Sequence, residues 1–235
     1  MEGKHANFGN GTEVLDAMES AQRYNVAIEH EIVAALGPPQ ETPRVLDVGA
    51  GGGEFAVRMK GRGYDVTCVE PDDAQRVALE AKGLTAYASL ALAEGPFDGA
   101  YMVNVLEHIQ DDVAILREIH DRLVPNAPVF IWVPAFEALY SDFDFALGHF
   151  RRYTRNGLRR AVMLGGFDVQ QTAYRDSLGW FVAFAWKVAP MRSSRSVSGG
   201  AVGLYDKWIF PASQLLDKAA SRGFGKNVIA VARRR

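Results

Sequence analysis

The chain has 235 residues, and 48% of them are hydrophobic, which is enough apolar material for one α/β domain with an elaboration. A formal net charge of −2 gives no overall attraction to nucleic acid, and a single cysteine, Cys68, excludes a disulfide framework. Because the N-terminus lacks a signal-peptide core and no apolar run reaches the roughly 18 residues of a membrane span, we expect a cytoplasmic protein without a transmembrane segment.

Strand patterns and helix patterns alternate along the chain. In chain order we expect a helix over 13–36, a strand over 44–48, a helix over 54–60, a strand over 64–69, a helix over 73–82, strands over 84–87 and 97–103, a helix over 111–123, a strand over 129–133, a helix over 154–164, and strands over 167–174 and 227–232. This spacing predicts an α/β fold with a Rossmann-like, seven-stranded, mostly parallel sheet and helices on both faces.

Two segments are too long to be plain connections within a single domain spanning residues 1–235. Residues 134–153 are expected to form a loop on the substrate side, and residues 175–225 a helical lid inserted between the last two strands. The aromatic lid, with a Ser- and Gly-rich linker over 193–200, either packs on the core or presents an amphipathic surface to a lipid-linked or large apolar acceptor. Peripheral membrane contact is therefore left open, and no oligomeric state is predicted.

A glycine turn joins the first strand to the following helix, in the run Arg44-Val-Leu-Asp-Val-Gly-Ala-Gly-Gly-Gly-Glu54. The next strand ends in an acid, Glu70, which is the arrangement that an open α/β sheet uses to bind a nucleoside. A dinucleotide fingerprint would need a glycine where the chain has Glu54. A carboxylate at Asp47 would also repel a pyrophosphate but suits a ligand that carries an ammonium or sulfonium group.

On these residues the chain resembles a class I S-adenosylmethionine (SAM)-dependent methyltransferase. The resemblance implies SAM as cofactor, with Asp47 near its ammonium, Glu70 at the ribose hydroxyls, and Pro71 and Asp72 flanking the adenine. The expected cofactor-binding residues are Asp47, Gly49, Ala50, Gly51, Glu70, Pro71, Asp72, Ser89, Leu90, Asn104 and Val105. The acid that is common after the third strand in such enzymes is not evident, since Ser89 and Leu90 occupy that region.

A second motif, Leu106-Glu-His108, follows the fourth strand and resembles the corresponding segment of small-molecule methyltransferases. His108 is a candidate general base because imidazole titrates near neutrality. The alternative is that Glu107 and His108 only hold the loop together. The Asn/Asp-Pro-Pro-aromatic run of enzymes that methylate nucleic-acid bases is absent here, so no nucleic-acid partner is expected.

A third motif, Gly148-His-Phe-Arg-Arg-Tyr-Thr154, resembles the signature of a bacterial methyltransferase group often found near polysaccharide and natural-product genes. His149 is the second candidate base, and the two arginines could clamp a carboxylate or phosphate. The expected substrate-binding residues are Tyr24, Arg151, Arg152 and Tyr153. Alternatively, both arginines pair with Asp142 and Asp144 and order the loop. No metal site is expected.

Together these features predict a SAM-dependent methyltransferase that acts on a small molecule through an oxygen or carbon nucleophile, such as an anionic or glycosylated natural product or a saccharide. Either His108 or His149 would serve as the base. Three alternatives stay open: a SAM-binding enzyme of non-methylating chemistry, a nicotinamide-dependent reductase on the same fold, and a non-catalytic partner that has kept the fold.

Overall fold

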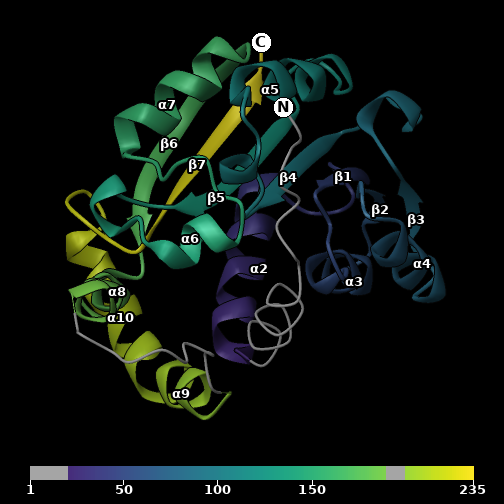
Figure 1. The fold of residues 1–235 in the computed structure, drawn as a ribbon. Coiled ribbons are helices and arrows are strands. Elements are labelled where there is room, and N and C mark those ends of the chain that lie inside the picture. The colour runs from purple at the N-terminus through teal and green to yellow at the C-terminus, as the bar shows by residue number, and fades with distance from the viewer. Residues whose placement is uncertain (1–20, 189–198) are drawn as a thin grey trace, which may run out of the picture.

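The computed structural model describes residues 21–188 and 199–235, and its centre is a seven-stranded sheet (Figure 1). The strands are β1 (Arg44–Val48), β2 (Asp65–Val69), β3 (Thr85–Tyr87), β4 (Gly99–Val103), β5 (Pro128–Pro134), β6 (Phe167–Arg175) and β7 (Asn227–Arg234). They lie in the order β3-β2-β1-β4-β5-β7-β6, and β7 runs antiparallel to both of its neighbours. The predicted fold class is confirmed.

Helices cover both faces of the sheet, as predicted. They are α2 (Gln22–Leu36), α3 (Glu54–Gly61), α4 (Asp73–Ala81), α5 (Asp112–Asp121) and α7 (Arg155–Leu164). On one face, Ile28 of α2 and Met59 of α3 pack in a core cluster with Phe130 of β5. On the other face, Leu116 of α5 and Leu158 of α7 form the second cluster. Every residue of β5 is buried, as expected for a central strand covered on both sides.

The first helix is described from Gln22, so the predicted start at residue 13 lies outside the described residues. The 134–153 segment is more ordered than a loop, with a 3₁₀ turn over Glu137–Leu139 and the short helix α6 over Asp142–Ala146. The side chains of Ser141 and Asp144 form a capping box at the start of α6, which explains why a helix begins there.

The described parts of the segment between β6 and β7 are mostly helical, with α8 (Ser177–Val188), α9 (Gly199–Leu204), a π-helical turn over Tyr205–Ile209 and α10 (Phe210–Ala220). Figure 1 shows these helices gathered beyond the ends of β6 and β7. Asp206 accepts hydrogen bonds from the amides of Arg23 (3.0 Å) and Tyr24 (2.8 Å), so it caps α2 from the insertion. The linker predicted over 193–200 lies outside the described residues, apart from its last two positions.

The insertion buries some apolar side chains and exposes others. Phe210 is buried in the core against Tyr24, whereas Trp208 is 65% exposed. The large apolar side chains exposed on the insertion are Phe181, Val182, Phe184, Val188, Leu204, Trp208, Leu215 and Leu216. None of the helices in the described ranges is both long enough and apolar enough to span a membrane. The lid and membrane-contact alternatives stay predictions.

Candidate cofactor and acceptor site

The glycine turn after β1 adopts a conformation that favours glycine. Gly49, Gly51 and Gly53 have φ values of +73°, +52° and +87°, a region that is strained for other residues. A Cβ on Gly49 would lie 2.5 Å from the Cγ2 atom of Val105. The turn therefore lies directly against the segment that follows β4, which brings two predicted cofactor-binding segments into contact.

Glu70, at the end of β2, lies across this turn. Its Oε2 accepts a hydrogen bond from the amide of Gly51 (2.8 Å), and its Oε1 accepts one from the amide of Asp72 (3.0 Å). Asp72 in turn caps α4 by accepting from the amide of Gln75 (2.9 Å). Pro71 and Asp72 are exposed at the same edge of the sheet. The carboxylate predicted for the ribose is thus fixed beside the turn by backbone donors.

Asp47 is the second-to-last residue of β1, next to the glycine turn, and its carboxylate is buried. Its Oδ2 accepts a hydrogen bond from the Tyr101 hydroxyl (2.9 Å). Burial raises the pKa of Asp47 from 3.8 to about 7, and the negative charge of Glu70 adds to the rise although the Tyr101 hydrogen bond opposes it. A cationic group beside Asp47 would reverse this rise, so the site suits a ligand that brings a positive charge.

The remaining predicted cofactor-binding residues differ in their exposure and backbone conformation. Leu90 begins a 3₁₀ turn and its side chain is buried in a core cluster, so only its backbone could reach a ligand. Ser89 is exposed just before it. Asn104, after β4, has a φ of +54° and donates its amide to the Trp132 carbonyl (2.8 Å). Cofactor contacts at these residues stay predictions.

On the other side of Val105, the chain forms a 3₁₀ turn over Leu106–His108. Glu107 in this turn is fully buried, and neither of its carboxylate oxygens has a hydrogen-bond partner. Burial raises the pKa of Glu107 to about 8, while its own amide and the charge of Arg152 work in the opposite direction. Its backbone carbonyl accepts from the amide of Phe150 (2.8 Å), which ties this turn to the third motif.

The two candidate bases come together although they are far apart in the sequence. The rings of His108 and His149 lie edge to face with centroids 4.5 Å apart. Although His108 is exposed as a residue, the desolvation of its ring and the proximity of His149 lower its pKa to about 4, against a raising contribution from the Leu147 carbonyl. His108 is therefore neutral at neutral pH, with a nitrogen lone pair that can bind a ligand, although the low pKa makes it a weaker base than an ordinary histidine.

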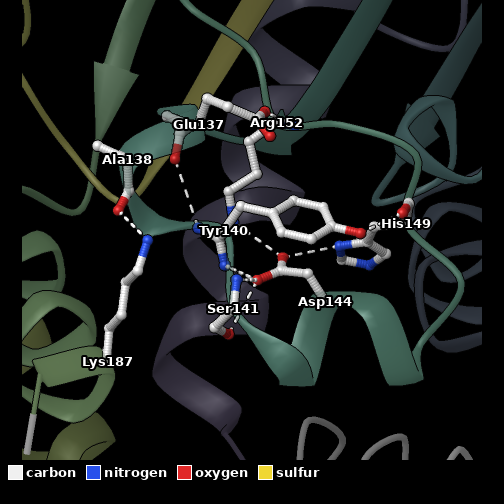
Figure 2. Close-up of polar contacts among 9 residues, drawn as sticks. Glu137, Ala138, Tyr140, Ser141, Asp144, His149, Arg152 and Lys187 are labelled. Carbon is white, nitrogen blue, oxygen red and sulfur yellow. Dashed lines mark hydrogen bonds and ion pairs between the residues drawn. The ribbon is translucent and has the colours of Figure 1, made fainter.

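His149 is held by a buried ion-pair network that Figure 2 shows in full. Its Nδ1 lies 2.9 Å from Oδ1 of Asp144, and Arg152 binds both oxygens of the same carboxylate at 2.8 and 3.0 Å. Burial alone would raise the pKa of Asp144, but the hydrogen bonds from His149 and Arg152 hold it well below its usual range. Asp144 therefore fixes the orientation of the His149 ring.

The alternative to substrate binding is that Arg151 and Arg152 pair with Asp142 and Asp144. Arg152 does pair with Asp144, but Arg151 pairs with a different aspartate. Arg151 pairs with Asp112 (3.1 Å) and donates to the Gln110 carbonyl (2.6 Å), because the loop passes over the start of α5 rather than over Asp142. The contacts of both arginines lie within the protein, and a role for either at the acceptor stays a prediction.

Tyr153 and Tyr24 are both buried, with hydroxyls engaged in the fold. Tyr153 donates to Asp112 (2.8 Å), and the Tyr24 hydroxyl accepts from the side-chain amide of Asn227 (2.8 Å). These contacts favour structural roles, so their predicted substrate contacts gain no support from the geometry. Sequence reasoning missed Asp144 as the partner of His149, and the Ser141–Asp144 spacing of a capping box was the available signal.

Comparisons with known proteins agree with this architecture. A family model described as a methyltransferase domain matches residues 19–172. The ubiquinone biosynthesis O-methyltransferase of Pseudomonas aeruginosa is 29% identical over 99 residues, a match that covers 37% of this chain and only 43% of that relative. A SAM-dependent methyltransferase from Archaeoglobus fulgidus superimposes with a TM-score of 0.61 and 20% identity, covering 91% of this chain and 94% of its own.

A second solved structure is geranyl diphosphate C-methyltransferase from Streptomyces coelicolor A3(2), in complex with Mg²⁺, geranyl-S-thiolodiphosphate and S-adenosylhomocysteine. It has a TM-score of 0.64 and 12% identity, and the match covers 89% of this chain and 76% of that one. At these identities the structural likeness establishes the fold.

Proposed function

The chain belongs to the methyltransferase-domain family, and from this premise we propose that it transfers a methyl group from SAM to an oxygen or carbon nucleophile of a small molecule. SAM is the cofactor, since the solved neighbours include SAM-dependent methyltransferases and one that contains S-adenosylhomocysteine. The observation that carries the proposal is the convergence of buried Asp47, the glycine turn and Glu70 at one edge of the sheet.

The residues present fit the cofactor in charge and in space. Asp47 is a buried acid whose ionised form would gain from a neighbouring ammonium group. A Cβ added to Gly51 would meet no atom closer than 3.8 Å, so the backbone of the turn has open space beside it for a ligand. Glu70 would accept hydrogen bonds from the ribose hydroxyls, and the backbone of Asn104 and Val105 would line the same site.

When bound, SAM would supply the electrophilic methyl group: an electron pair of the oxygen or carbon acceptor would form the bond to the methyl carbon as the carbon–sulfur bond breaks, S-adenosylhomocysteine would leave with a neutral sulfur, and the acceptor would give up a proton. The protein's task is to align the acceptor and to take that proton. His149 is oriented by Asp144, and His108 is neutral beside it, so we propose that one of them is the base.

The Pseudomonas aeruginosa relative is an O-methyltransferase, which supports an oxygen acceptor. The Streptomyces coelicolor neighbour of the same fold is a C-methyltransferase, which keeps a carbon acceptor in the proposal. The acceptor itself stays open within these two classes, with an anionic or glycosylated molecule as the first kind to screen.

The test is calorimetry with SAM and S-adenosylhomocysteine on the wild type, on Glu70→Ala and on Glu80→Ala as a matched control on the exposed side of α4. We expect micromolar binding to the wild type and the control, and a loss of at least about tenfold in Glu70→Ala, because charged acceptors make the stronger hydrogen bonds. Absence of binding to the wild type, with binding of a nicotinamide cofactor instead, would refute the proposal.

A further inference from the structure

Glu107 lacks the partners that a buried carboxylate requires. Its side chain is fully buried, and no residue in the described ranges donates a hydrogen bond to either oxygen. An isolated ionised carboxylate in a protein interior is strongly unfavourable unless it is paired or coordinates a metal. The charge of Arg152 lowers this cost, but its guanidinium is bonded to Asp144.

Two imidazoles approach this unpartnered carboxylate. Ligand atoms of Glu107, His108 and His149 all lie within 4.8 Å of one another. The Nδ1 atom of His149 is bonded to Asp144, so its Nε2 remains for a ligand, and Figure 2 shows that second nitrogen pointing away from Asp144. The Leu147 carbonyl raises the pKa of His108, and the imidazole of His108 has two ring nitrogens, so one can bind a ligand.

We propose that Glu107, His108 and His149 form a binding site for a divalent first-row transition-metal ion, of which Zn²⁺ and Co²⁺ are the probes. Two imidazoles and one carboxylate are a donor set that suits such ions, whereas Mg²⁺ prefers oxygen ligands throughout. With metal–ligand bonds of about 2.1 Å, tetrahedral donors lie about 3.4 Å apart, so the side chains would close on the ion by small rotations. Three protein ligands leave at least one position open.

The surroundings of His149 match the support that a metal ligand needs. A ligating histidine commonly donates its other ring N–H to a carboxylate, which fixes the tautomer and the ring orientation. Asp144 is that carboxylate here, and it is itself held by Arg152 and by the amide of Ser141 (2.9 Å). The helix α6 and its capping box thus build an outer layer around a histidine that faces Glu107.

The position of the site relates it to methyl transfer, and this part of the inference rests on the proposed function. Val105 lies against the glycine turn, and the metal-binding cluster begins two residues later. An acceptor hydroxyl bound at the open position would lose its proton more readily, because a cation stabilises the resulting oxyanion. With the ion bound, the histidines would be ligands rather than bases, and the proton of the acceptor hydroxyl would pass to solvent water.

The test is Co²⁺ and Zn²⁺ binding to chelator-treated protein, followed by visible absorption and calorimetry. The variants are Glu107→Gln, His149→Gln and, as a matched control, His120→Asn, since His120 also pairs with an aspartate but lies on α5. We expect one ion per chain in the wild type and the control, and at least about tenfold weaker binding in both site variants, as for lost or disordered metal ligands.

His149→Gln keeps the test valid if the buried Glu107→Gln variant does not fold, and SAM calorimetry on each variant reports folding independently of the metal. Three results would each overturn the inference. The wild type does not bind Co²⁺ or Zn²⁺, both site variants bind these ions as tightly as the wild type, or Mg²⁺ binds as well at equal concentration. SAM binding without metal binding would refute this inference alone. Metal binding without SAM binding would refute the proposed function alone.

Discussion

Asp47 should destabilise the ligand-free protein at neutral pH, and the substitution Asp47→Asn tests this. The pKa of Asp47 is about 7 in the folded protein against an ordinary value of 3.8. Between these values the folded protein holds a proton on Asp47 that the unfolded chain releases, so stability falls as pH rises through this window. The full penalty is present above pH 7, and at roughly 1.36 kcal/mol per pKa unit it is about 4 kcal/mol at most.

The assay is urea unfolding of the wild type and Asp47→Asn between pH 4 and pH 8. Asparagine keeps an acceptor for the Tyr101 hydroxyl but cannot ionise, so the variant should gain stability over the wild type as pH rises. The free-energy difference between the two proteins should therefore grow towards about 4 kcal/mol and level off above pH 7. Asp142→Asn, at an exposed aspartate on α6, should show a difference that does not change with pH.

The same carboxyl links stability to ligand binding. If Asp47 meets the ammonium group of SAM, the cation favours the ionised form, so SAM affinity should rise as pH increases through 7. Asp47→Asn should bind SAM more weakly and without this pH dependence. A free-energy difference between the two proteins that stays constant from pH 4 to pH 8 would refute the reasoning about burial, whatever the affinity data show.

Two further substitutions test the packing of the site. Gly49→Ala should lower the free energy of unfolding in urea by about 3 kcal/mol, because the residue has a φ of +73° and a Cβ there would clash with Val105. The control Gly61→Ala should be nearly neutral in the same titration, since a Cβ there would have no neighbour within 4 Å. Asp144→Ala should lower the free energy of unfolding by about 3–5 kcal/mol, because it leaves Arg152 without its buried partner, and Asp144→Ala/Arg152→Met should recover part of this loss in thermal unfolding. Equal losses in the single and double variants would show that the ion pair is not the cause.

The sheet and its helices follow from local patterns in the sequence. Buried strands such as β5 are continuous apolar runs in the sequence. Helices α5 and α7 begin after Asp111 and Thr154, whose side chains accept hydrogen bonds from backbone amides of the first turn. The glycine turn and Glu70 are also local signals, since each marks the end of a strand at one edge of the sheet. These features are therefore accessible to sequence reasoning.

The acceptor side depends on contacts between distant segments, and sequence patterns do not carry them. Arg151 meets Asp112 rather than the neighbouring Asp142 because the loop crosses the start of α5. The meeting of Glu107 with His149 likewise depends on the backbone bond between Phe150 and Glu107, which nothing in either motif reveals. A buried carboxylate without a partner becomes visible only when the packing around it is known.

The place of β7 in the sheet has a consequence for the order in which the protein is made. Within the described residues β6 pairs with the sheet only through β7, which is the later strand in the chain. Until β7 emerges from the ribosome, the apolar strand β5 remains an open edge of the sheet, and β6 cannot join the sheet. Open apolar edges are sites of mispairing between chains. Slow synthesis of the intervening helices would therefore prolong the period in which the edge of β5 is exposed to mispairing.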